Sequence, residues 1–420
     1  MTPREFAHSV VDHLRRHGYE ALWAGGCVRD YLLGLEPHDY DVATNARPPQ
    51  VQKLFRRTVA VGVQFGVIDV LGPEPQLQVQ VATFRSDGTY TDGRHPDSVT
   101  FGNAEADALR RDFTINGMFF DPLTDKVIDY VGGQADLQAK VLRAIGDPQE
   151  RFTEDKLRLL RAVRFAARFA LTLDPATEAA IVRMASQLTV VSAERITEEL
   201  RKMLSHHARH TALRLVHRLG LLQPILPDLF SPQATFAALG HLPAEATFPL
   251  ALAVFLLDLA EGQGEEIRQR LFQRKWRQAF AEKLRLSNHE LDEMSWLLDH
   301  HADLRQAPTL PWSQLKPLLA HTGIDDLLAL HRAQALAHEQ SLEALDYCAE
   351  RLRTWTEDDL NPLPLVTGDD LKEAGLRPGP KFKEILIRLR AAQLDGHLVT
   401  RVEALAFLRD LVQQAQASSG

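Results

Sequence analysis

Apolar residues change their spacing near residue 150, and the change divides the chain into two regions. Before it, they recur in short runs that predict strands. In the run at 77–83, the apolar Leu77, Val79 and Val81 alternate with polar or small residues, as in a strand with one buried face. The other predicted strands lie at 21–24, 40–43, 59–61 and 67–71.

Apolar positions three and four residues apart predict helices. One helix is expected at 5–18, and a shorter one follows a glycine turn at 28–33. After residue 150 the strand patterns vanish, and nearly all of the remaining chain predicts helix. The polar segment 85–108 is rich in Gly and Asp and predicts a loop. Proline-containing breaks interrupt the helices at 224–232, 307–311 and 361–380.

These elements predict an α+β protein with a small mixed-sheet head and a long, all-helical remainder. A length of 420 residues favours two or more domains. The 2 cysteines are too few for a disulfide framework and fit a reducing, cytoplasmic compartment. The net charge of −8 argues mildly against nucleic-acid binding, although basic runs at 151–168 and 268–285 allow a local cationic surface.

Asp39 and Asp41 place two carboxylates on one face at the start of a predicted strand. Such a pair repels unless a cation lies between its members. Mg²⁺ takes one or two protein carboxylates and completes its shell with phosphates and water. The pair therefore predicts a magnesium site for phosphoryl transfer, although a D-x-D sequence on a solvated turn is common by chance.

A glycine turn lies just before this pair. Gly25 and Gly26 let backbone N–H groups approach phosphates, the following helix adds its dipole, and Arg29 adds a bidentate donor. A glycine turn, an arginine and a D-x-D pair within so short a stretch predict a nucleotide-binding site.

The order of motifs resembles the class II tRNA nucleotidyltransferase and poly(A) polymerase family, in particular its bacterial CCA-adding enzymes. The opening G-G-x-V-R-D and D-x-D agree with that family. Four further motifs follow in the family's order: Arg110 to Asn116, Gly132 to Arg143, Glu154 to Arg158 and Arg195 to Leu200. The resemblance implies a polymerase-beta-like head at 1–145, a nucleobase-selecting neck at 146–205, and a tRNA-binding body and tail at 206–420.

The resemblance also implies roles in binding the nucleotide. Arg111 and Asp112 would close over the incoming sugar, where the carboxylate accepts from a ribose hydroxyl, and Asn116 would also bind the nucleotide. Glu154 would orient Arg158. The sequence adds a chemical reason for the next pair, because an Asp155 acceptor beside an Arg158 donor matches the pairing edges of cytosine and adenine but not those of guanine and uracil. A surface ion pair is the alternative for Asp155 and Arg158.

Arg158, Arg161, Arg164 and Arg168 recur at helical spacing. Arg161 and Arg164 are the candidates for contacts with the triphosphate, and solvent-facing arginines on an amphipathic helix are the alternative.

One residue departs from the family's pattern. Gln80 stands where relatives usually carry an acid, and an amide cannot act as a general base. Asp39 and Asp41 are therefore expected to carry the metal. Asp69 is a possible substitute for the missing acid, or else a surface residue at a strand end.

We therefore expect addition of CCA to the 3′ end of tRNA, with Mg²⁺ as cofactor, CTP and ATP as substrates, and a monomer or homodimer. The alternatives are an A-only-adding enzyme or a poly(A) polymerase, a catalytically silent RNA-binding protein, and a nucleotidyltransferase for small molecules. The segment 61–67 looks more like the tRNA-type members than the poly(A) polymerases.

Overall fold

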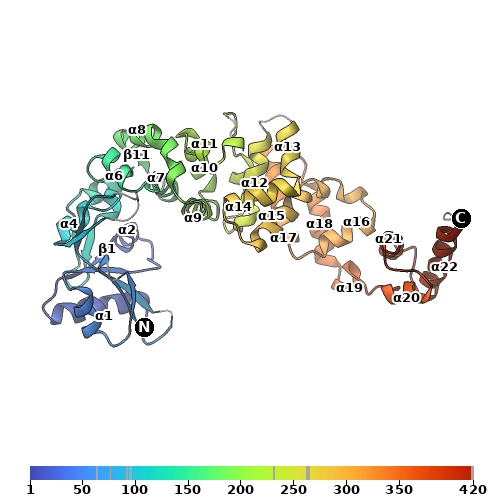
Figure 1. Ribbon diagram of the computed structural model, residues 1–420, viewed down its shortest axis with the longest axis horizontal. Coiled ribbons are helices and arrows are strands. Elements are labelled where there is room, and N and C mark those ends of the chain that lie inside the picture. The colour runs from blue at the N-terminus through green and yellow to red at the C-terminus, as the bar shows by residue number, and fades with distance from the viewer. Residues whose placement is uncertain are drawn as a thin grey trace. The chain divides into compact units, whose positions relative to one another are not determined.

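The computed structural model describes the chain except for residues 63, 64, 76, 91, 92, 94–96, 230, 231, 262–264 and 418–420. It divides into two compact units, Met1–Phe230 and Ser231–Gly420. A sheet occurs in the first unit, and helices make up the described part of the second (Figure 1). The predicted α+β class is confirmed. The boundaries at 145 and 205 both fall inside the first unit and stay predictions.

The head of the first unit is built on a mixed sheet in the strand order β3-β4-β5-β2-β1-β8-β9. Neighbouring strands run antiparallel, except for β2 and β5, which run parallel. The strands are β1 (Ala21–Ala24), β2 (Asp41–Thr44), β3 (Thr58–Gly62), β4 (Val67–Leu71), β5 (Gln78–Thr83), β8 (Phe119–Asp121) and β9 (Lys126–Ile128).

Helix α1 (Pro3–Arg16) packs against β1, β2 and β5. It begins at a capping box, in which the Thr2 hydroxyl accepts from the Glu5 N–H and the Glu5 carboxylate accepts from the Thr2 N–H. Its apolar stripe, which includes Val10 and Leu14, is buried. In β5, Val79 and Val81 are buried while Gln78 and Gln80 are exposed, as the alternation predicted. The sheet thus has one packed face and one face with polar groups.

The other elements of the first unit are short helices and two pairs of short strands. They are α2 (Gly26–Leu32), α3 (Pro48–Leu54), β6 (Arg85–Asp87), β7 (Val99–Phe101), α4 (Ala104–Leu109), η2 (Thr114–Asn116), α5 (Gly133–Gln138), β10 (Val141–Leu142), α6 (Pro148–Glu154), α7 (Arg158–Arg168), β11 (Thr172–Leu173), α8 (Pro175–Met184), η3 (Ala185–Val190), α9 (Ala193–Leu204), α10 (Arg209–Arg218), α11 (Leu222–Ile225) and η4 (Pro227–Leu229).

Two predictions about these segments are wrong. The segment 85–108 is not simply a loop, because β6 pairs with β7 and α4 follows, capped by the Asn103 side chain. Its residues 91, 92 and 94–96 lie outside the described residues. Strands also do not vanish after residue 150, since β11 pairs with β10. Both strand pairs are too short to leave a periodic pattern.

Among the described residues of the second unit, all regular secondary structure is helical, as predicted. Its most apolar helix, α12 (Phe248–Glu261), is buried along nearly its whole length. Among the described residues, no helix combines the length and apolar character needed to span a membrane. The other helices are η5 (Ala238–His241), α13 (Glu265–Leu271), α14 (Arg274–Lys283), α15 (Asn288–Asp299), η6 (Asp303–Thr309), α16 (Trp312–Leu319), α17 (Ile324–Ala337), α18 (Glu343–Thr354), α19 (Glu357–Leu360), α20 (Gly368–Glu373), α21 (Pro380–Leu394) and α22 (Arg401–Ala417).

Candidate functional site

A polar groove of about 590 Å³ lies in the first unit, between the open face of the sheet and α7. Arginines dominate its lining, and fewer carboxylates face them, so the groove attracts polyanions although the chain is acidic overall. Among the described residues, the arginines are Arg29, Arg85, Arg110, Arg111, Arg158, Arg161, Arg164 and Arg168, and the carboxylates are Asp41, Asp112 and Asp155.

The groove brings together most of the residues singled out from the sequence. Those that line it are Gly25, Gly26, Arg29, Asp41, Arg111, Asp112, Asn116, Asp155, Arg158, Arg161 and Arg164. Asp39 and Glu154 are not part of the lining. Each of them acts on a residue of the lining. The charge of Asp39 acts on Asp41, and Glu154 forms an ion pair with Arg158.

Asp41 is the first residue of β2, and Asp39 lies just before the strand rather than in it. Tyr40 between them is buried, with its ring centroid 4.9 Å from that of Trp23. Surrounding atoms of the groove displace part of the water near the Asp41 carboxyl, and this desolvation raises its pKa. Asp39 and Asp69 raise the pKa further, against the opposing effect of Arg111. A cation beside Asp41 would relieve this repulsion.

Gly25 makes the turn between β1 and α2. Its φ is 74°, in the region that favours glycine. A Cβ at this position would lie 2.7 Å from Nη1 of Arg111, closer than non-bonded atoms approach. Arg111 Nη1 donates to the Asn116 carbonyl oxygen at 3.3 Å, so the glycine leaves room for an arginine that crosses the turn. The predicted glycine turn is present, and its glycine also accommodates this side chain.

Arg29 lies in the groove wall and is buried. Its Nη1 donates to Asn116 Oδ1 at 2.6 Å, and its Nη2 lies 2.7 Å from Asp30 Oδ1. Its guanidinium carbon lies 4.2 Å from the centroid of the Phe169 ring. Burial lowers the pKa of Arg29, and Asp30 opposes that shift. Each of its three nitrogens already has an acceptor, so Arg29 holds Asn116 in place, and its bidentate contact with phosphate stays a prediction.

Asp112 lies at the centre of a buried hydrogen-bond network. One carboxylate oxygen accepts from the Phe113 N–H at 2.9 Å and from Asn116 Nδ2 at 3.0 Å. The other accepts from Arg161 Nε at 3.0 Å and Nη2 at 2.8 Å. Burial alone would raise the pKa of Asp112, but Arg161 and the Asn116 bond outweigh it and hold the pKa at about 2. A ribose hydroxyl can donate to Asp112 only in exchange for one of these donors.

The network continues along α7. Arg164 Nε donates to Glu199 Oε2 at 2.6 Å, and Glu199 Oε1 lies 3.9 Å from Arg161 Nη1. Both Arg164 and Glu199 are buried, and Glu199 belongs to α9. The sequence pointed to Arg164 but gave Glu199 no role, although it stands in the fifth family motif. Helix α9 therefore fixes the arginines that α7 presents to the groove.

The spacing of three residues between Asp155 and Arg158 predicts that both lie on one face of a single helix, but this prediction is wrong, because the segment from Glu154 to Arg158 joins two helices. Helix α6 ends at Glu154 and α7 begins at Arg158, with Asp155 in an extended conformation between them. The Asp155 carboxylate accepts from the Leu157 N–H at 3.0 Å, which stabilises this break. Arg195 donates to both Asp155 oxygens, at 3.1 and 2.7 Å. Arg195 is thus a supporting residue to which the sequence interpretation gave no role.

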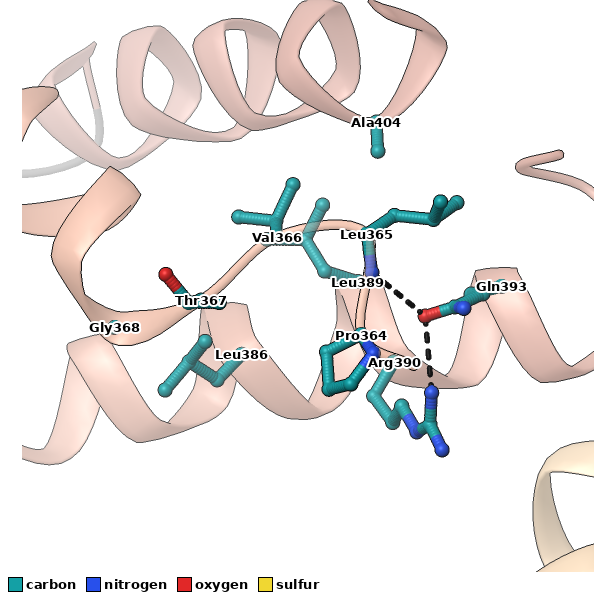
Figure 2. A pocket seen from close by; sticks show the side chains of 10 residues that line it. All are labelled: Pro364, Leu365, Val366, Thr367, Gly368, Leu386, Leu389, Arg390, Gln393 and Ala404. Carbon is teal, nitrogen blue, oxygen red and sulfur yellow. Dashed lines mark hydrogen bonds between the residues drawn. The ribbon is translucent and has the colours of Figure 1, made fainter. Parts of the chain in front are cut away.

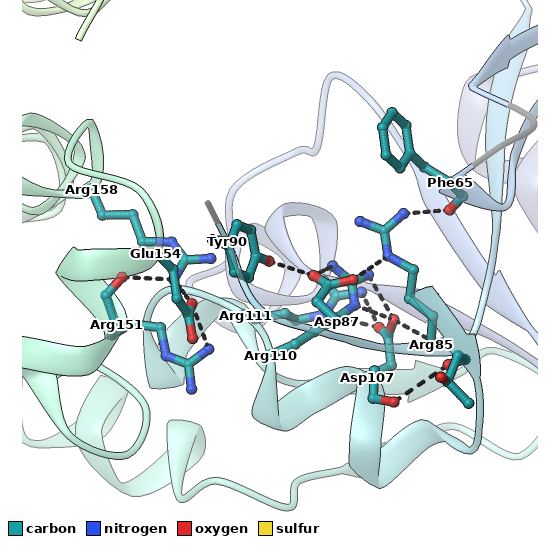
Figure 3. Close-up of polar contacts among 12 residues, drawn as sticks. Phe65, Arg85, Asp87, Tyr90, Asp107, Arg110, Arg111, Arg151, Glu154 and Arg158 are labelled. Carbon is teal, nitrogen blue, oxygen red and sulfur yellow. Dashed lines mark hydrogen bonds and ion pairs between the residues drawn. The ribbon is translucent and has the colours of Figure 1, made fainter. Parts of the chain in front are cut away.

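Arg158, at the start of α7, has its own partners at this junction. It pairs with Glu154, and its Nη1 also donates to the Arg151 carbonyl oxygen at 2.9 Å. Figure 3 shows Arg151, Glu154 and Arg158 turned toward one another. The predicted pairing of Glu154 with Arg158 is confirmed. Separate partners therefore hold Asp155 and Arg158, both of which line the groove.

A second ion cluster lies beside the groove, where α4 packs against β6. The buried Asp107 accepts from Arg110 Nη2 at 2.7 Å and from Arg111 Nη2 at 2.9 Å (Figure 3). Burial opposes ionisation of Asp107, but these two arginines lower its pKa. Asp87 accepts from the Tyr90 hydroxyl at 2.7 Å and lies 2.9 Å from Arg85 Nε. Asp107 was missed from the sequence, although its spacing of three and four residues from two arginines is a helical ion-pair signal.

A separate pocket of about 410 Å³ lies in the second unit and is mostly apolar. Figure 2 shows the segment 364–368 crossing α21, with Ala404 of α22 above it. Gln393 Oε1 accepts from the Leu365 N–H at 3.2 Å and from Arg390 Nη1 at 3.0 Å. The described residues that line this pocket include neither paired carboxylates nor a glycine turn. The features expected of a nucleotide-binding site therefore lie in the groove of the first unit.

Comparison with known proteins gives a consistent result. Residues 21–143 match the profile of the poly A polymerase head domain, and residues 170–231 match that of a probable RNA- and SrmB-binding site of polymerase A. A CCA-adding enzyme of Levilactobacillus brevis is 34% identical over 408 residues, covering 96% of this chain and 97% of the relative. One from Bacillus subtilis is 33% identical over 400 residues, covering 93% of each chain.

Solved structures agree with these sequence matches. The crystal structure of the Bacillus stearothermophilus CCA-adding enzyme in complex with CTP superposes with a TM-score of 0.81 at 28% identity, covering 100% of both chains. The Thermotoga maritima CCA-adding enzyme complexed with tRNA has a TM-score of 0.65 at 19% identity, covering 97% of this chain and 95% of that one, and shows the shared fold alone.

Proposed function

Because the chain belongs to the family of the CCA-adding enzymes, we infer that it adds C, C and A to the 3′ end of tRNA without a nucleic-acid template. The RNA 3′ hydroxyl attacks the α-phosphate of CTP or ATP, and pyrophosphate leaves. The observation that carries this conclusion is the groove in which Asp41 faces a wall of arginines. It suits a substrate that is itself a polyanion.

Members of this family generally need a divalent metal ion, and we propose that the ion is Mg²⁺, held by Asp39 and Asp41. The residues fit the ion, because Asp41 lies where Asp39 and Asp69 add negative charge. Within the described residues, no cluster of three or more metal-ligating side chains occurs. Mg²⁺ takes one or two protein carboxylates and completes its shell with phosphates and water. When bound, it neutralises the triphosphate and activates the attacking hydroxyl.

For base selection we propose Asp155 and Arg158. An acceptor beside a donor matches the amino group and ring nitrogen of both cytosine and adenine. Arg195 and Glu154 support this role, because each holds one member of the pair in place. Uracil or guanine would leave buried polar groups unpaired, at a cost of about 1–3 kcal/mol for each group.

For the triphosphate we propose Arg161 and Arg164, with Gly25 and Gly26 at the turn and Arg111 beside it. The two α7 arginines already carry acidic partners, Asp112 and Glu199, which keep their long side chains in one conformation. A pre-organised arginine loses less side-chain entropy when phosphate arrives. Arg29 and Asn116 complete the proposed nucleotide site by holding Asp112 from the side of α2.

These positions support the functions that we propose for three parts of the chain. The metal site and glycine turn belong to a head at 1–145. Asp155 and Arg195 belong to a nucleobase-selecting neck at 146–205. The helical residues 206–420 would bind the tRNA acceptor stem through its shape and phosphates.

Ordered addition tests the function. The purified chain is incubated with tRNA that ends at the discriminator base, with CTP alone, ATP alone, or both. We expect two nucleotides from CTP alone and three from both. Extension by ATP alone, with no incorporation of C, would instead identify an A-only enzyme. Failure of every nucleotide to extend the RNA would favour a catalytically silent RNA-binding protein.

A further inference from the structure

A row of three polar side chains crosses one face of the sheet at the edge of the groove. Asp41 of β2 is the register partner of Gln80 of β5, and Gln80 is the register partner of Asp69 of β4. Side chains directly opposite one another on neighbouring strands project from the same face. Asp41 and Gln80 line the groove, and Asp69 lies one strand beyond them.

Asp69 is not the surface residue at a strand end that the sequence left open. It is the middle residue of β4 and only 5% exposed, between the buried Ile68 and Val70. Two neutral amides hold its carboxylate, Gln78 Nε2 at 2.5 Å and Gln80 Nε2 at 3.4 Å. A buried carboxylate held by neutral groups rather than by a cation is costly, so its presence in a strand calls for a functional explanation.

The hydrogen bond to Asp69 settles how the Gln80 amide is turned. An ionised carboxylate only accepts, so it takes the NH₂ group of the amide. The carbonyl oxygen of Gln80 must then face away from Asp69. Because the three residues form a row, that direction leads toward Asp41 and the groove.

We propose that Asp69 is a positioning residue, which fixes the Gln80 amide so that its carbonyl oxygen accepts a hydrogen bond from the attacking 3′ hydroxyl of the RNA. This inference rests on the proposed function. Gln80 orients the hydroxyl beside Asp41 and removes no proton, because an amide oxygen is not basic. Asp69 on β4 thus acts through Gln80 on β5, the strand beside β2, which carries Asp41.

Two single variants test the two parts of this device. Asp69→Asn can donate to the amide oxygen as well as accept from its NH₂ group, and so lets Gln80 turn over. Gln80→Leu removes the oxygen at an exposed position, where folding is little affected. We expect each to lower kcat for CTP addition about tenfold, the effect of roughly 1.4 kcal/mol, with KM for CTP within about twofold of wild type.

A rescue experiment distinguishes a positioning role of Asp69 from a role in protein stability alone. Gln80→Glu alone places two carboxylates side by side and should also lower kcat. In the double variant Gln80→Glu with Asp69→Asn, the amide introduced on β4 donates to the carboxylate introduced on β5, whose other oxygen faces the groove. We expect kcat to return to within about threefold of wild type.

Asp121→Asn is the matched control. Asp121 is another buried strand aspartate of the same sheet, paired with Arg15 at 2.8 Å and outside the groove lining. This variant should change the melting temperature and leave kcat unaltered. Wild-type kcat in both Asp69→Asn and Gln80→Leu would overturn the inference, as would a double variant no better than the worse single one. A wild-type chain that adds no nucleotide would instead overturn the proposed function itself.

Discussion

At the scale of single residues, the groove is organised by acids that hold arginines. Asp112 holds Arg161, Glu199 holds Arg164, and Asp107 holds Arg110 and Arg111. These acids are buried, whereas most arginines keep part of their surface open to the groove. Each pair fixes a cation in one geometry before the substrate binds, which reduces the entropic cost of binding.

Gly25→Ala tests the turn. It forces alanine into a positive φ, at a cost of about 1–2 kcal/mol, and pushes Arg111 aside. We expect kcat/KM for CTP to fall about tenfold or more. Gly18→Ala is the control, because Gly18 has a φ of +83° with nothing within 4 Å of an added Cβ. Gly25→Ala should lose at least as much stability as Gly18→Ala, and equal activity in the two would refute a role for the turn in catalysis.

Arg195→Leu tests base selection. Without Arg195, Asp155 loses its fixed orientation, so discrimination between CTP and UTP should fall about tenfold. The measurement is the ratio of kcat/KM for the two nucleotides on one tRNA. Arg201→Leu, on the same helix and paired with Glu198 at 3.5 Å, is the control. Unchanged discrimination in Arg195→Leu would exclude Asp155 as the selecting residue.

At the scale of elements, the strands up to residue 83 could be predicted because alternation at β5 and short apolar runs leave a clear pattern. The sequence pattern also predicted helix α2 and its glycine turn. The two-residue strands β10 and β11 carry no periodicity. The break at Asp155 depends on a local side-chain bond and a distant arginine, neither of which is visible in spacing.

For the residues of the site, too, the sequence predicts what lies in a motif but not what depends on packing. Asp41 and the arginines of α7 could be found because motifs place them in order. Arg195 and Glu199 lie in a motif as well, but their roles follow from packing of α9 against α7. The burial of Asp69 depends on its cross-strand neighbours Gln78 and Gln80, so the sequence alone left it undecided.

Helix α12 carries a buried acid whose titration should be measurable. Burial raises the pKa of Asp258 to about 7, with Glu261 adding to the shift and the Leu239 N–H opposing it. In the unfolded chain the pKa is about 4. The folded state therefore holds the proton longer, and the contribution of Asp258 to stability falls as pH rises from about 4 to about 7.

Asp258→Asn should therefore raise the melting temperature relative to wild type more at pH 8 than at pH 5, by roughly 3–6 °C. The Asn carbonyl oxygen can still accept from the Leu239 N–H. Asp292→Asn, at an exposed position on α15, controls for the loss of one negative charge. A difference between Asp258→Asn and wild type that is the same at both pH values would contradict the raised pKa.

At the scale of the whole molecule, a net charge of −8 coexists with an arginine-lined groove. Binding of tRNA should depend on this local surface and therefore on salt. We expect the Kd for tRNA to rise about ten- to hundredfold between roughly 50 and 200 mM salt, through release of counterions. Titrations of labelled tRNA at several salt concentrations measure the slope. A flat dependence would show that phosphate contacts contribute little.

The central claim is that Asp41, with Asp39, holds the metal at which nucleotides are joined to tRNA. The most direct test compares single-turnover addition of CTP to tRNA by wild type and by Asp41→Asn in Mg²⁺. We predict a rate lower by roughly 10²–10³-fold in the variant, with unchanged tRNA binding. Its melting temperature should be equal or higher, because the substitution removes a repelled charge. Addition by Asp41→Asn at the wild-type rate would contradict the account.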